Sequence, residues 1–424
     1  MKGLVYSWFF PPINSSEGLV TFKLLKNSEY NYDVFTQKND TVWTYGANEN
    51  KLVSKNINPI FAQSDNGRDW VKEGVEYYEK NKNKYDFIMT RSMSPDAHKI
   101  ALEIKKRHPE VKWIASFGDP ISDNPFEYFN RVNNPYAIKG NRFENLKIGY
   151  IISPMRLMKS AFWKLRRKRY LMTIENESKK FKLQTSVLNQ ADRIILNNPY
   201  QKEHMLKKQK NRDVIEKKII IIPHTYDKDF YAKKVNKNSE KIVISYLGHC
   251  DDIRTPKCFF EALGRLKSKY DNISDKLIVN FYGDLSVKDK ARIIDEEIYD
   301  FVKVRKPVTY FESLKIMQES DWLLLIDANL GQYINENIFF AAKIADYLGA
   351  NNNILGITME KGASADILRE TNSIVSSHSS DEIYMYLSQI INNRCLHKTC
   401  NQEKYNIKNV VGDYDKMVEE LVRK

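Results

Sequence analysis

Three side chains of different chemistry recur at helical spacing within residues 339–358, FFAAKIADYLGANNNILGIT. Lys343, Asp346 and Tyr347 lie three and four positions apart, so a helix would place a cation, a carboxylate and a phenol on one face. Such a face can bind an anion through the ammonium and hydroxyl groups through the carboxylate. The same spacing also suits an ordinary amphipathic helix with the two charges in water and the phenol over the core, so spacing alone leaves both interpretations open.

A second candidate site lies in residues 246–263, YLGHCDDIRTPKCFFEAL, where an apolar strand is followed by a turn and a helical pattern. Gly248 lets the chain turn sharply at the strand end, and Arg254 and Lys257 stand where the helix begins. Helix N-termini attract anions through free N–H groups and the aligned dipole, and an arginine adds planar, two-pronged hydrogen bonding to a phosphate. The pattern is compatible with a phosphate site, although an exposed arginine in such a turn is common without one.

A carboxylate follows another apolar run in SFGDPISDNPF, residues 116–126. Asp119 would lie at the carboxyl end of a strand, from which it can reach into a cleft, but an aspartate before proline is also a frequent turn residue. The chain contains no Gly-x-Gly-x-x-Gly, no phosphate-binding loop ending in Gly-Lys-Ser/Thr and no nucleophile elbow. The dehydrogenase, NTPase and hydrolase classes therefore lose their usual sequence support.

Cysteine usage bears on the compartment and on metal binding. Four cysteines in 424 residues argue against a disulfide framework and fit a reducing, cytoplasmic compartment. The stretches 249–258 and 395–400 contain cysteine and histidine, but neither has a partner pair at zinc-site spacing. We therefore expect ordinary thiols and no bound metal.

The elements that must position these side chains alternate between apolar, β-rich runs and helical patterns. GLVYSWFF, YDVFTQ, YDFIMTR, KWIASFGD and RIILNN indicate strands in the first half, and KIVISYLG, LIVNFYG, WLLLID and NILGIT in the second. Helical patterns such as SPDAHKIALEIKKRHPEV and TPKCFFEALGRLKSKY come between them. This alternation is typical of parallel sheets with helices on both faces, so we expect an α/β protein with two doubly wound, Rossmann-like domains.

The joint between the domains is expected near residues 217–231, KKIIIIPHTYDKDFY, which a charged linker follows. This predicts an N-terminal domain over residues 1–223 and a C-terminal domain over residues 224–409. The helical pattern within residues 410–424 predicts a last helix that packs back on the N-terminal domain. Ligands bind beyond the carboxyl ends of the strands in open parallel sheets, so two facing sheets would form a deep interdomain cleft.

The charge balance suggests an anionic partner. The formal net charge is +13, and residues 148–170, IGYIISPMRLMKSAFWKLRRKRY, interleave aromatic and apolar side chains with many cations. This stretch suits the headgroup region of an anionic bilayer and, equally, a solvated basic helix packed on its own domain. No apolar run reaches the roughly 18 residues of a membrane-spanning helix. A nucleic-acid partner is not expected, because no recognised binding motif surrounds the cations.

Further stretches follow a family pattern in matching order. FFPPINSSEG resembles a Pro-rich loop near an acceptor site, and YDFIMTRSMSPDAHKIALEIKKRHPEVKWIASFGDP resembles a block that ends in W-A-D-F-R-D-P. ADRIILNNPYQKEHM and IIPHTYDKDFY resemble two short motifs near the joint. YLGHCDDIRTPKCFFEAL resembles a diphosphate loop, and KIADYLGANNNIL a block that holds a donor nucleotide. Together they resemble the retaining nucleotide-sugar glycosyltransferases of the GT-B fold (glycosyltransferase group 1, family 4).

The resemblance implies transfer of a sugar from a UDP- or GDP-linked donor to a hydroxyl of a glycan or lipid-linked acceptor, with retention and without metal or cofactor. It implies that Asp346 binds the donor ribose, Arg254 a diphosphate oxygen and Lys343 the phosphate or sugar. Asp119 would face the sugar or acceptor as the catalytic carboxylate. The implied donor-site residues are Gly248, Arg254, Lys257, Lys343, Asp346 and Tyr347, and the implied acceptor-side residues are Ser15, Ser16, Glu17 and Gly18.

Departures from the family pattern leave alternatives open. Ile338 stands eight residues before Asp346, where relatives with the full acidic signature place a glutamate, and Glu336 is two residues off. FGDP lacks the arginine of FRDP, and His224 replaces the usual asparagine. A non-catalytic sugar-nucleotide-binding or glycan-assembly subunit is the main alternative, and a sugar-nucleotide epimerase shares the fold. The expected location is cytoplasmic, with residues 148–170 as a peripheral contact at the inner membrane face.

Overall fold

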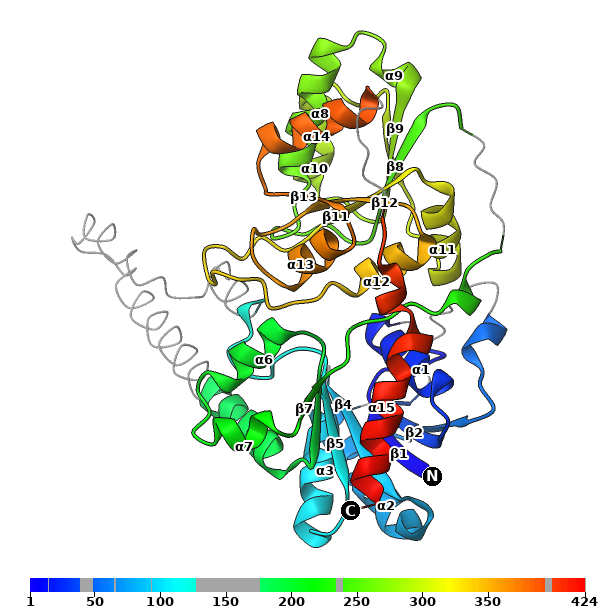
Figure 1. Ribbon diagram of the computed structural model, residues 1–424, viewed down its shortest axis with the longest axis vertical. Coiled ribbons are helices and arrows are strands. Elements are labelled where there is room, and N and C mark those ends of the chain that lie inside the picture. Colours follow the sequence, from blue (N-terminus) through cyan, green and yellow to red (C-terminus); the bar gives the residue numbers. More distant parts are fainter. Residues whose placement is uncertain are drawn as a thin grey trace, which may run out of the picture.

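Two parallel sheets, each flanked by helices, lie one above the other along the long axis of the molecule (Figure 1). The computed structural model describes residues 1–13, 15–38, 49–64, 66–92, 94–126, 176–233, 239–392 and 399–423. The seven-stranded sheet has the order β3-β2-β1-β4-β5-β6-β7, and the six-stranded sheet has the order β10-β9-β8-β11-β12-β13. Every pairing is parallel, which confirms the expected α/β class with two Rossmann-like domains.

The first sheet carries the N-terminal domain. Its strands are β1 (Lys2–Ser7), β2 (Asn31–Thr36), β3 (Ile57–Phe61), β4 (Phe87–Ser92), β5 (Trp113–Phe117), β6 (Arg193–Leu196) and β7 (Ile219–Ile221). Its helices are α1 (Ser16–Asn27), α2 (Gly67–Asn81), α3 (Asp96–Arg107), α6 (Pro199–Leu206) and α7 (Arg212–Glu216), with a further helix over residues 176–190 and short 3-10 turns η1 (Glu49–Leu52) and η2 (Lys82–Lys84). All five residues of β5 are buried, because helices cover both faces of the sheet.

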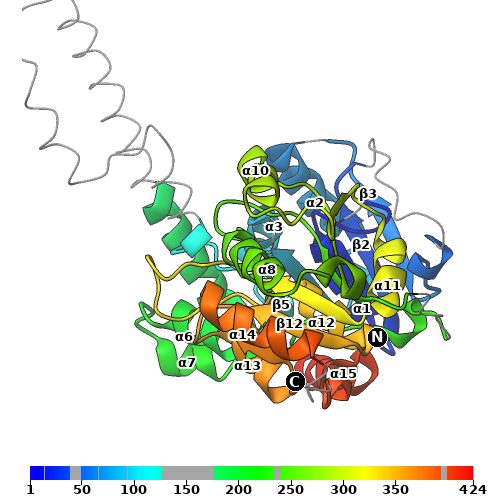
Figure 2. The ribbon, with the colours of Figure 1, turned by 90° about the horizontal axis from the view of Figure 1, so that it is seen from above.

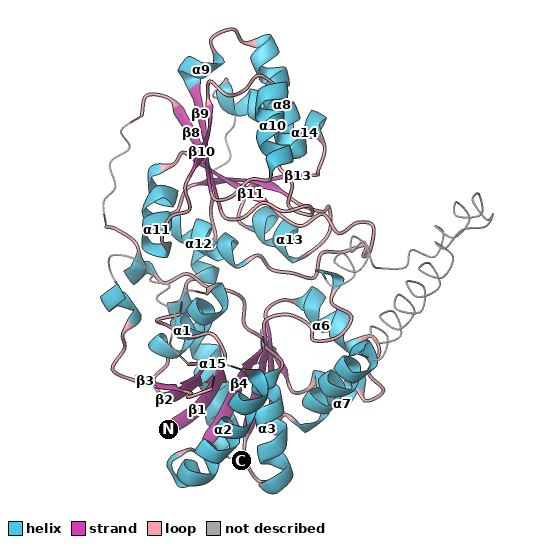
Figure 3. Cartoon of the chain, turned by 180° about the vertical axis from the view of Figure 1, so that it is seen from behind, coloured by secondary structure: helices cyan, strands magenta, loops and turns pink. Residues whose placement is uncertain are grey.

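The second sheet carries the C-terminal domain. Its strands are β8 (Ile242–Leu247), β9 (Leu277–Tyr282), β10 (Val302–Arg305), β11 (Trp322–Ile326), β12 (Asn353–Ile357) and β13 (Ile374–Ser376). Its helices are α8 (Lys257–Lys269), α9 (Ile273–Lys276), α10 (Val287–Asp295), α11 (Tyr310–Glu319), α12 (Ala342–Ala350), α13 (Ala363–Glu370) and α14 (Ser380–Ile391). Figure 3 shows the strands in the interior of both domains with the helices outside them.

The strand order reverses once in each sheet, and these reversals mark where a crevice opens. In the first sheet β1 pairs with both β2 and β4, and in the second sheet β8 pairs with both β9 and β11. Chain connections leave in opposite directions from such a point, so the loops at the carboxyl ends of the strands part and leave room for a ligand. The loops after β1, β4, β8 and β11 are therefore the places where each domain can carry a site.

The last helix, α15 (Ile407–Val422), returns to the N-terminal domain and lies beside α1 in two views (Figure 1; Figure 2). It follows the 3-10 turn η5 (Gln402–Tyr405), and the Asn406 side chain caps its first turn. Tyr414 is fully buried, and its hydroxyl lies 3.5 Å from the sulfur of Met89 on β4. The Tyr30 hydroxyl donates to the carbonyl oxygen of Asp415 at 3.2 Å.

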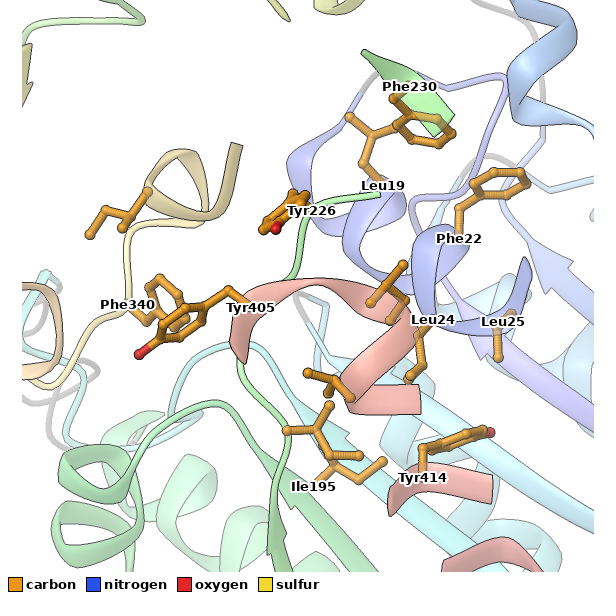
Figure 4. Packing of buried hydrophobic residues seen from close by; sticks show 14 of the residues in the cluster. Leu19, Phe22, Leu24, Leu25, Ile195, Tyr226, Phe230, Phe340, Tyr405 and Tyr414 are labelled. Carbon is orange, nitrogen blue, oxygen red and sulfur yellow. The ribbon is translucent and has the colours of Figure 1, made fainter. Parts of the chain in front are cut away.

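One apolar core continues from one domain into the other (Figure 4). Leu19 and Phe22 of α1 pack in the same cluster as Tyr226 and Phe230, which lie in the segment that crosses between the sheets. Phe340, just before α12, belongs to this cluster as well. Burying a side chain of this size stabilises by roughly 1.5–3 kcal/mol, so the shared core fixes how α1 and α12 face each other.

Some of the sequence features lie outside the described residues. The basic and aromatic stretch 148–170 is one of them, and residues 393–398, which include most of the second cysteine- and histidine-containing stretch, are another. Within the described ranges, no helix is long and apolar enough to cross a membrane. Over the same ranges, no three His, Cys, Asp or Glu side chains are grouped as metal ligands would be.

Candidate functional site

The carboxyl ends of the two sheets meet at the domain interface. Asn198, which follows β6, donates from its side-chain amide to the carbonyl oxygen of Ile338 at 2.9 Å. Phe126, beyond the carboxyl end of β5, packs its ring against Phe339, with the ring centroids 4.2 Å apart. The loops that follow β5 and β6 therefore touch the segment between β11 and α12 across the domain interface.

Gly248 and Gly283 follow neighbouring strands of the second sheet, at positions where a larger side chain would collide with its surroundings. Gly248 after β8 has φ +138°, and Gly283 after β9 has φ +149°, a backbone region that favours glycine. A Cβ atom on Gly283 would lie 2.0 Å from the carbonyl oxygen of Gly248. A Cβ atom on Gly248 would lie 2.6 Å from the Lys343 ammonium. The glycine pair thus makes the space in which this ammonium sits, and Gly283 was not singled out from the sequence.

Lys343 lies in the first turn of α12 and points to the end of β8. Its ammonium donates to the carbonyl oxygen of Leu247 at 3.1 Å and lies 4.6 Å from the centroid of the Tyr246 ring. No carboxylate of the described residues forms an ion pair with it. Burial, followed by the nearby positive charge of Arg254, lowers the pKa of Lys343 to about 8. A half-buried cation without a counter-ion would gain free energy from a bound anion.

Arg254 supplies a second cation at the same place. Its guanidinium donates to the Asp251 carboxylate at 2.9 Å and stacks on the ring of Phe126, 5.0 Å from the centroid. Asp251 also accepts from the backbone N–H of Arg254 at 2.8 Å, which fixes the loop. Lys257, at the start of α8, is half exposed and lies 3.7 Å from Glu261 one turn later. No contact joins Lys257 to the two other cations.

The side chains of Lys343, Asp346 and Tyr347 on α12 point in different directions. Asp346 accepts hydrogen bonds on Oδ1 from the Lys23 ammonium at 3.2 Å and the Tyr310 hydroxyl at 3.0 Å. Tyr347 is fully buried, and its hydroxyl donates to the carbonyl oxygen of Leu324 at 3.1 Å. The Tyr347 hydroxyl also accepts from the backbone N–H of Leu247 at 3.4 Å, beneath the end of β8 to which the Lys343 ammonium points. The helix therefore sends its cation to the crevice, its carboxylate to the other domain and its phenol into the core.

The N-terminal wall of the domain interface contains a buried ion pair that the sequence did not predict. Arg91 of β4 donates to the two carboxylate oxygens of Glu17 at 2.7 and 3.2 Å and to the Ser116 hydroxyl at 2.9 Å. Both side chains are at least 90% buried. Arg91 stands at the end of a predicted strand, YDFIMTR, where nothing in the local pattern marks a partner 74 residues away.

The remaining acceptor-side residues form the start of α1. The Ser15 hydroxyl caps the helix by accepting from the Gly18 N–H at 3.5 Å, and Ser16 is exposed. A Cβ atom on Gly18 would lie 3.2 Å from the carbonyl oxygen of Phe9, so a glycine allows the helix to approach the loop after β1. The first turn of α1 therefore presents two serine hydroxyls beside a carboxylate that Arg91 already neutralises.

Asp119 is the uncompensated carboxylate of this wall. It is half-buried, and no described residue forms a hydrogen bond or ion pair with its side chain. Burial, and then the nearby Glu17 carboxylate, raise the pKa of Asp119 to about 6. The positive charges of Arg91 and Arg254 act in the opposite direction. A carboxyl group with a pKa near neutrality can accept a proton or a hydroxyl hydrogen bond.

The loop that carries Asp119 is held firmly. The carbonyl oxygen of Gly118 accepts from the Asn197 amide at 2.8 Å and from the Gln201 amide at 3.0 Å. His224 lies nearby in the crossing segment, with its ring 4.9 Å from that of Phe340. Burial is the main reason that the pKa of His224 falls to about 3, so its imidazole is neutral at pH 7. The two uncharged amides thus fix the backbone directly before Asp119.

Comparisons with known proteins identify the fold. No protein-family model matches the chain, and no curated protein matches its sequence. Sucrose-phosphate synthase from Thermosynechococcus elongatus superposes with a TM-score of 0.60 at 10% identity, over 100% of this chain and 94% of that one. The apo lipopolysaccharide outer core galactosyltransferase WaaB gives 0.58 at 10% identity, over 99% of both chains. A Listeria monocytogenes protein assigned as a UDP-N-acetylglucosamine 2-epimerase gives 0.54 at 9% identity, over 97% and 94%.

At 9–10% identity the likeness shows the fold alone, the two-domain GT-B fold. It covers both domains and nearly the full length of each of these chains. The GT-B architecture expected from the sequence is thereby confirmed.

Proposed function

We propose that this protein is a glycosyltransferase that moves a sugar from a UDP- or GDP-linked donor to a hydroxyl of a glycan or lipid-linked acceptor. Retention of the anomeric configuration and independence of metal are part of the proposal. One observation carries it above all: Lys343 and Arg254 lie together without full counter-charge, near Asp119 of the opposite domain. The GT-B fold supports the same assignment, with the donor on the C-terminal domain.

The two cations suit the diphosphate of the donor. Negative charge develops on the departing nucleoside diphosphate in the transition state, and preorganised cations stabilise that charge most where water is excluded. Lys343 is already placed by Leu247 and the space above Gly248, and Arg254 by Asp251 and the ring of Phe126. Neither side chain would have to reorganise at the moment of reaction, and no metal is needed in this scheme.

The opposite wall suits a hydroxyl acceptor. Asp119 has no partner among the described residues and can accept the hydrogen bond, and then the proton, of an attacking hydroxyl. Ser16 at the start of α1 is exposed and offers its hydroxyl group to a glycan, next to Ser15, whose hydroxyl caps the helix. Glu17 would shape the acceptor site through Arg91 and would not act as a base, because the guanidinium occupies both of its oxygens.

A non-catalytic, sugar-nucleotide-binding subunit of the same fold is the second candidate. The observation that favours it is Ile338, which is buried and apolar where relatives with the full signature place a glutamate. The epimerase-like neighbour adds a related possibility, since the same fold holds a sugar nucleotide without an acceptor.

We also propose that residues 148–170 contact an anionic bilayer at the cytoplasmic face. Vesicle flotation of the full chain tests that contact, and no binding to anionic vesicles would contradict it.

The first experiment is thermal unfolding with UDP, GDP, CMP and ADP at millimolar concentration. A ligand at about 100 times its Kd adds roughly 2.7 kcal/mol of stability. Lys343→Met is expected to abolish the shift, and Lys257→Met, an exposed cation of the same domain, is expected to keep it. Asp346→Ala is a poor variant for this purpose, because it would leave the Lys23 ammonium buried without its carboxylate.

The outcomes separate the proposals. A shift with one nucleotide, followed by release of that nucleotide from its sugar donor when an acceptor is added, supports the transferase. Binding without turnover on a panel of glycan and lipid-linked acceptors selects the non-catalytic subunit. If no nucleotide changes the thermal stability, both the transferase and the non-catalytic subunit are contradicted.

A further inference from the structure

A buried ion pair joins the two domains next to the proposed donor site. The ammonium of Lys23, on α1 of the N-terminal domain, lies 3.2 Å from Oδ1 of Asp346, on α12 of the C-terminal domain. The side chain of Lys23 is 3% exposed, and that of Asp346 is 14% exposed. The backbone carbonyl of Asp346 is held as well, by the Tyr231 hydroxyl at 2.8 Å. Both ends of the pair are therefore fixed.

The two side-chain donors leave one carboxylate oxygen free. Lys23 and the Tyr310 hydroxyl both donate to Oδ1 of Asp346, at 3.2 and 3.0 Å. Oδ2 receives no hydrogen bond from any residue that the structure describes. A carboxylate offers about four acceptor positions, and the side chain of Asp346 remains 14% exposed. Oδ2 can therefore accept a hydrogen bond from the hydroxyl of a ligand.

The spacing of Lys343 and Asp346 on α12 suits the two ends of a nucleoside diphosphate. Asp346 follows Lys343 by three residues on α12, so their Cβ atoms lie roughly 5–6 Å apart along the helix surface. Lys343 points to the proposed diphosphate position above Gly248. A ribose whose diphosphate lies against Lys343 would therefore place its hydroxyl groups within reach of the next turn of the helix.

We propose that Lys23 is a positioning residue for donor binding. It holds Oδ1 of Asp346 so that Oδ2 receives a ribose hydroxyl, and ribose recognition by one domain then requires contact with the other. The inference rests on the proposed nucleotide-sugar function. It adds that the ribose of a nucleotide is recognised only while α1 and α12 are in contact. It also adds that a lysine of the acceptor-side domain sets the preference for ribose over deoxyribose.

The test is the affinity ratio between ribonucleotides and deoxynucleotides. UDP, GDP and ADP and their 2′-deoxy and 3′-deoxy counterparts are titrated calorimetrically against the wild type and the Lys23→Met, Lys23→Arg and Tyr310→Phe variants. Lys26→Met is the matched control, because Lys26 lies on the same helix but pairs with Asp227 at 2.8 Å.

The wild type is expected to prefer the ribonucleotide about tenfold, as a hydrogen bond to a charged group allows. The ratio is expected to fall to about one in Lys23→Met and to recover partly in Lys23→Arg, because a cation returns. It is expected to stay near tenfold in Lys26→Met. Affinity for the deoxynucleotide should change by less than about twofold throughout, because the diphosphate contacts remain.

Three outcomes would overturn the inference, and they differ in what they say of the proposed function. If the tenfold preference survives in Lys23→Met and Tyr310→Phe, the ion pair is only structural and the donor site stands. If the wild type does not distinguish ribose from deoxyribose, Asp346 is not the ribose ligand. If no nucleotide binds the wild type, the proposed function falls too. Tyr310→Phe removes a single hydroxyl, so it decides the ratio even if Lys23→Met does not fold.

Discussion

Two cations on opposite sides of the domain interface, Arg91 on β4 and Lys343 on α12, have opposite surroundings. Arg91 makes two hydrogen bonds to the Glu17 carboxylate and a third to Ser116. Lys343 has one carbonyl oxygen and an aromatic ring for neighbours, and the charged group with the largest effect on its pKa is another cation, Arg254. A buried charge that its own chain neutralises is part of the framework, whereas one that is left without a counter-ion is available to a ligand.

The carboxylates repeat the contrast. Glu17 gives both oxygens to Arg91, whereas Asp119 has no partner among the residues described and its pKa rises to about 6, chiefly through burial. The groups that the chain leaves uncompensated thus come one from each wall. This is the arrangement that a reaction between a donor on one domain and an acceptor on the other requires, and three predictions test it.

The largest expected effect is on stability. Glu17→Leu would leave the permanently charged Arg91 buried without its carboxylate, and we expect a loss of about 3–5 kcal/mol in the free energy of unfolding. Urea denaturation measures it. The double variant Glu17→Leu/Arg91→Met should recover most of the loss, because an apolar pair replaces the ion pair. If the single variant loses less than about 1 kcal/mol, the Glu17–Arg91 pair does not stabilise the framework, and the contrast between paired Arg91 and unpaired Lys343 fails.

The second effect is expected on binding. Lys343→Met should keep the free energy of unfolding within about 1 kcal/mol, because no ion pair is broken, and weaken nucleoside diphosphate binding about tenfold or more. The pKa of Lys343, about 8, is below the usual 10.5, so the unfolded chain binds more protons between these values. The contribution of Lys343 to stability therefore rises as pH increases from 8 to 10.5. Affinity for the diphosphate should fall over the same range, because the ammonium loses its proton.

Calorimetric titration of the nucleotide between pH 6.5 and 9.5 checks the predicted fall in affinity. Lys257→Met is the control, because the Lys257 ammonium is half exposed. A pH dependence that is the same in Lys343→Met and in the wild type would show that another group is responsible.

The smallest effect concerns Asp119. Its pKa of about 6 lies above the usual 3.8, so the folded chain binds more protons than the unfolded chain between these values. Its contribution to stability is therefore lost as pH rises from about 4 to 6. Asp119→Asn should remove this loss, a difference on the order of 1 kcal/mol for a half-buried group. If Asp119 takes the proton of the acceptor, the rise of kcat/KM with pH through about 6 should also vanish. Parallel stability curves for variant and wild type would contradict the assignment.

Strand and helix alternation could be predicted because it depends on local pattern. The apolar run WLLLI became β11, fully buried as such runs in parallel sheets are. The short edge strand β3 was not predicted, since its sequence, INPIF, contains Pro59 and is largely exposed. The glycine turn at Gly248 and the loop cation Arg254 could also be singled out, because a strand, a turn and a helix start are local features.

The pairings that give each site residue its role could not be predicted. Lys23 and Asp346 are 323 positions apart in the chain, and only the packing of α1 against α12 brings them together. Helical spacing predicted Lys343, Asp346 and Tyr347 on one face of a helix, and all three lie on α12, but spacing does not say which neighbour lies opposite each of them. Directions that differ by a fraction of a turn lead here to the end of β8, to Lys23 of the other domain and to a buried core.

The return of α15 to the first domain also has a consequence for biosynthesis. The helix covers α1 and β4 with residues 407–422, which are made about 315 positions after β4 is complete. At roughly 5–20 residues per second, the first sheet waits tens of seconds on the ribosome before its last helix is available. Its apolar surface under Tyr414 stays uncovered during that time. A nascent-chain chaperone that recognises such surface would bind this protein once the first sheet is made and release it only after α15 is available.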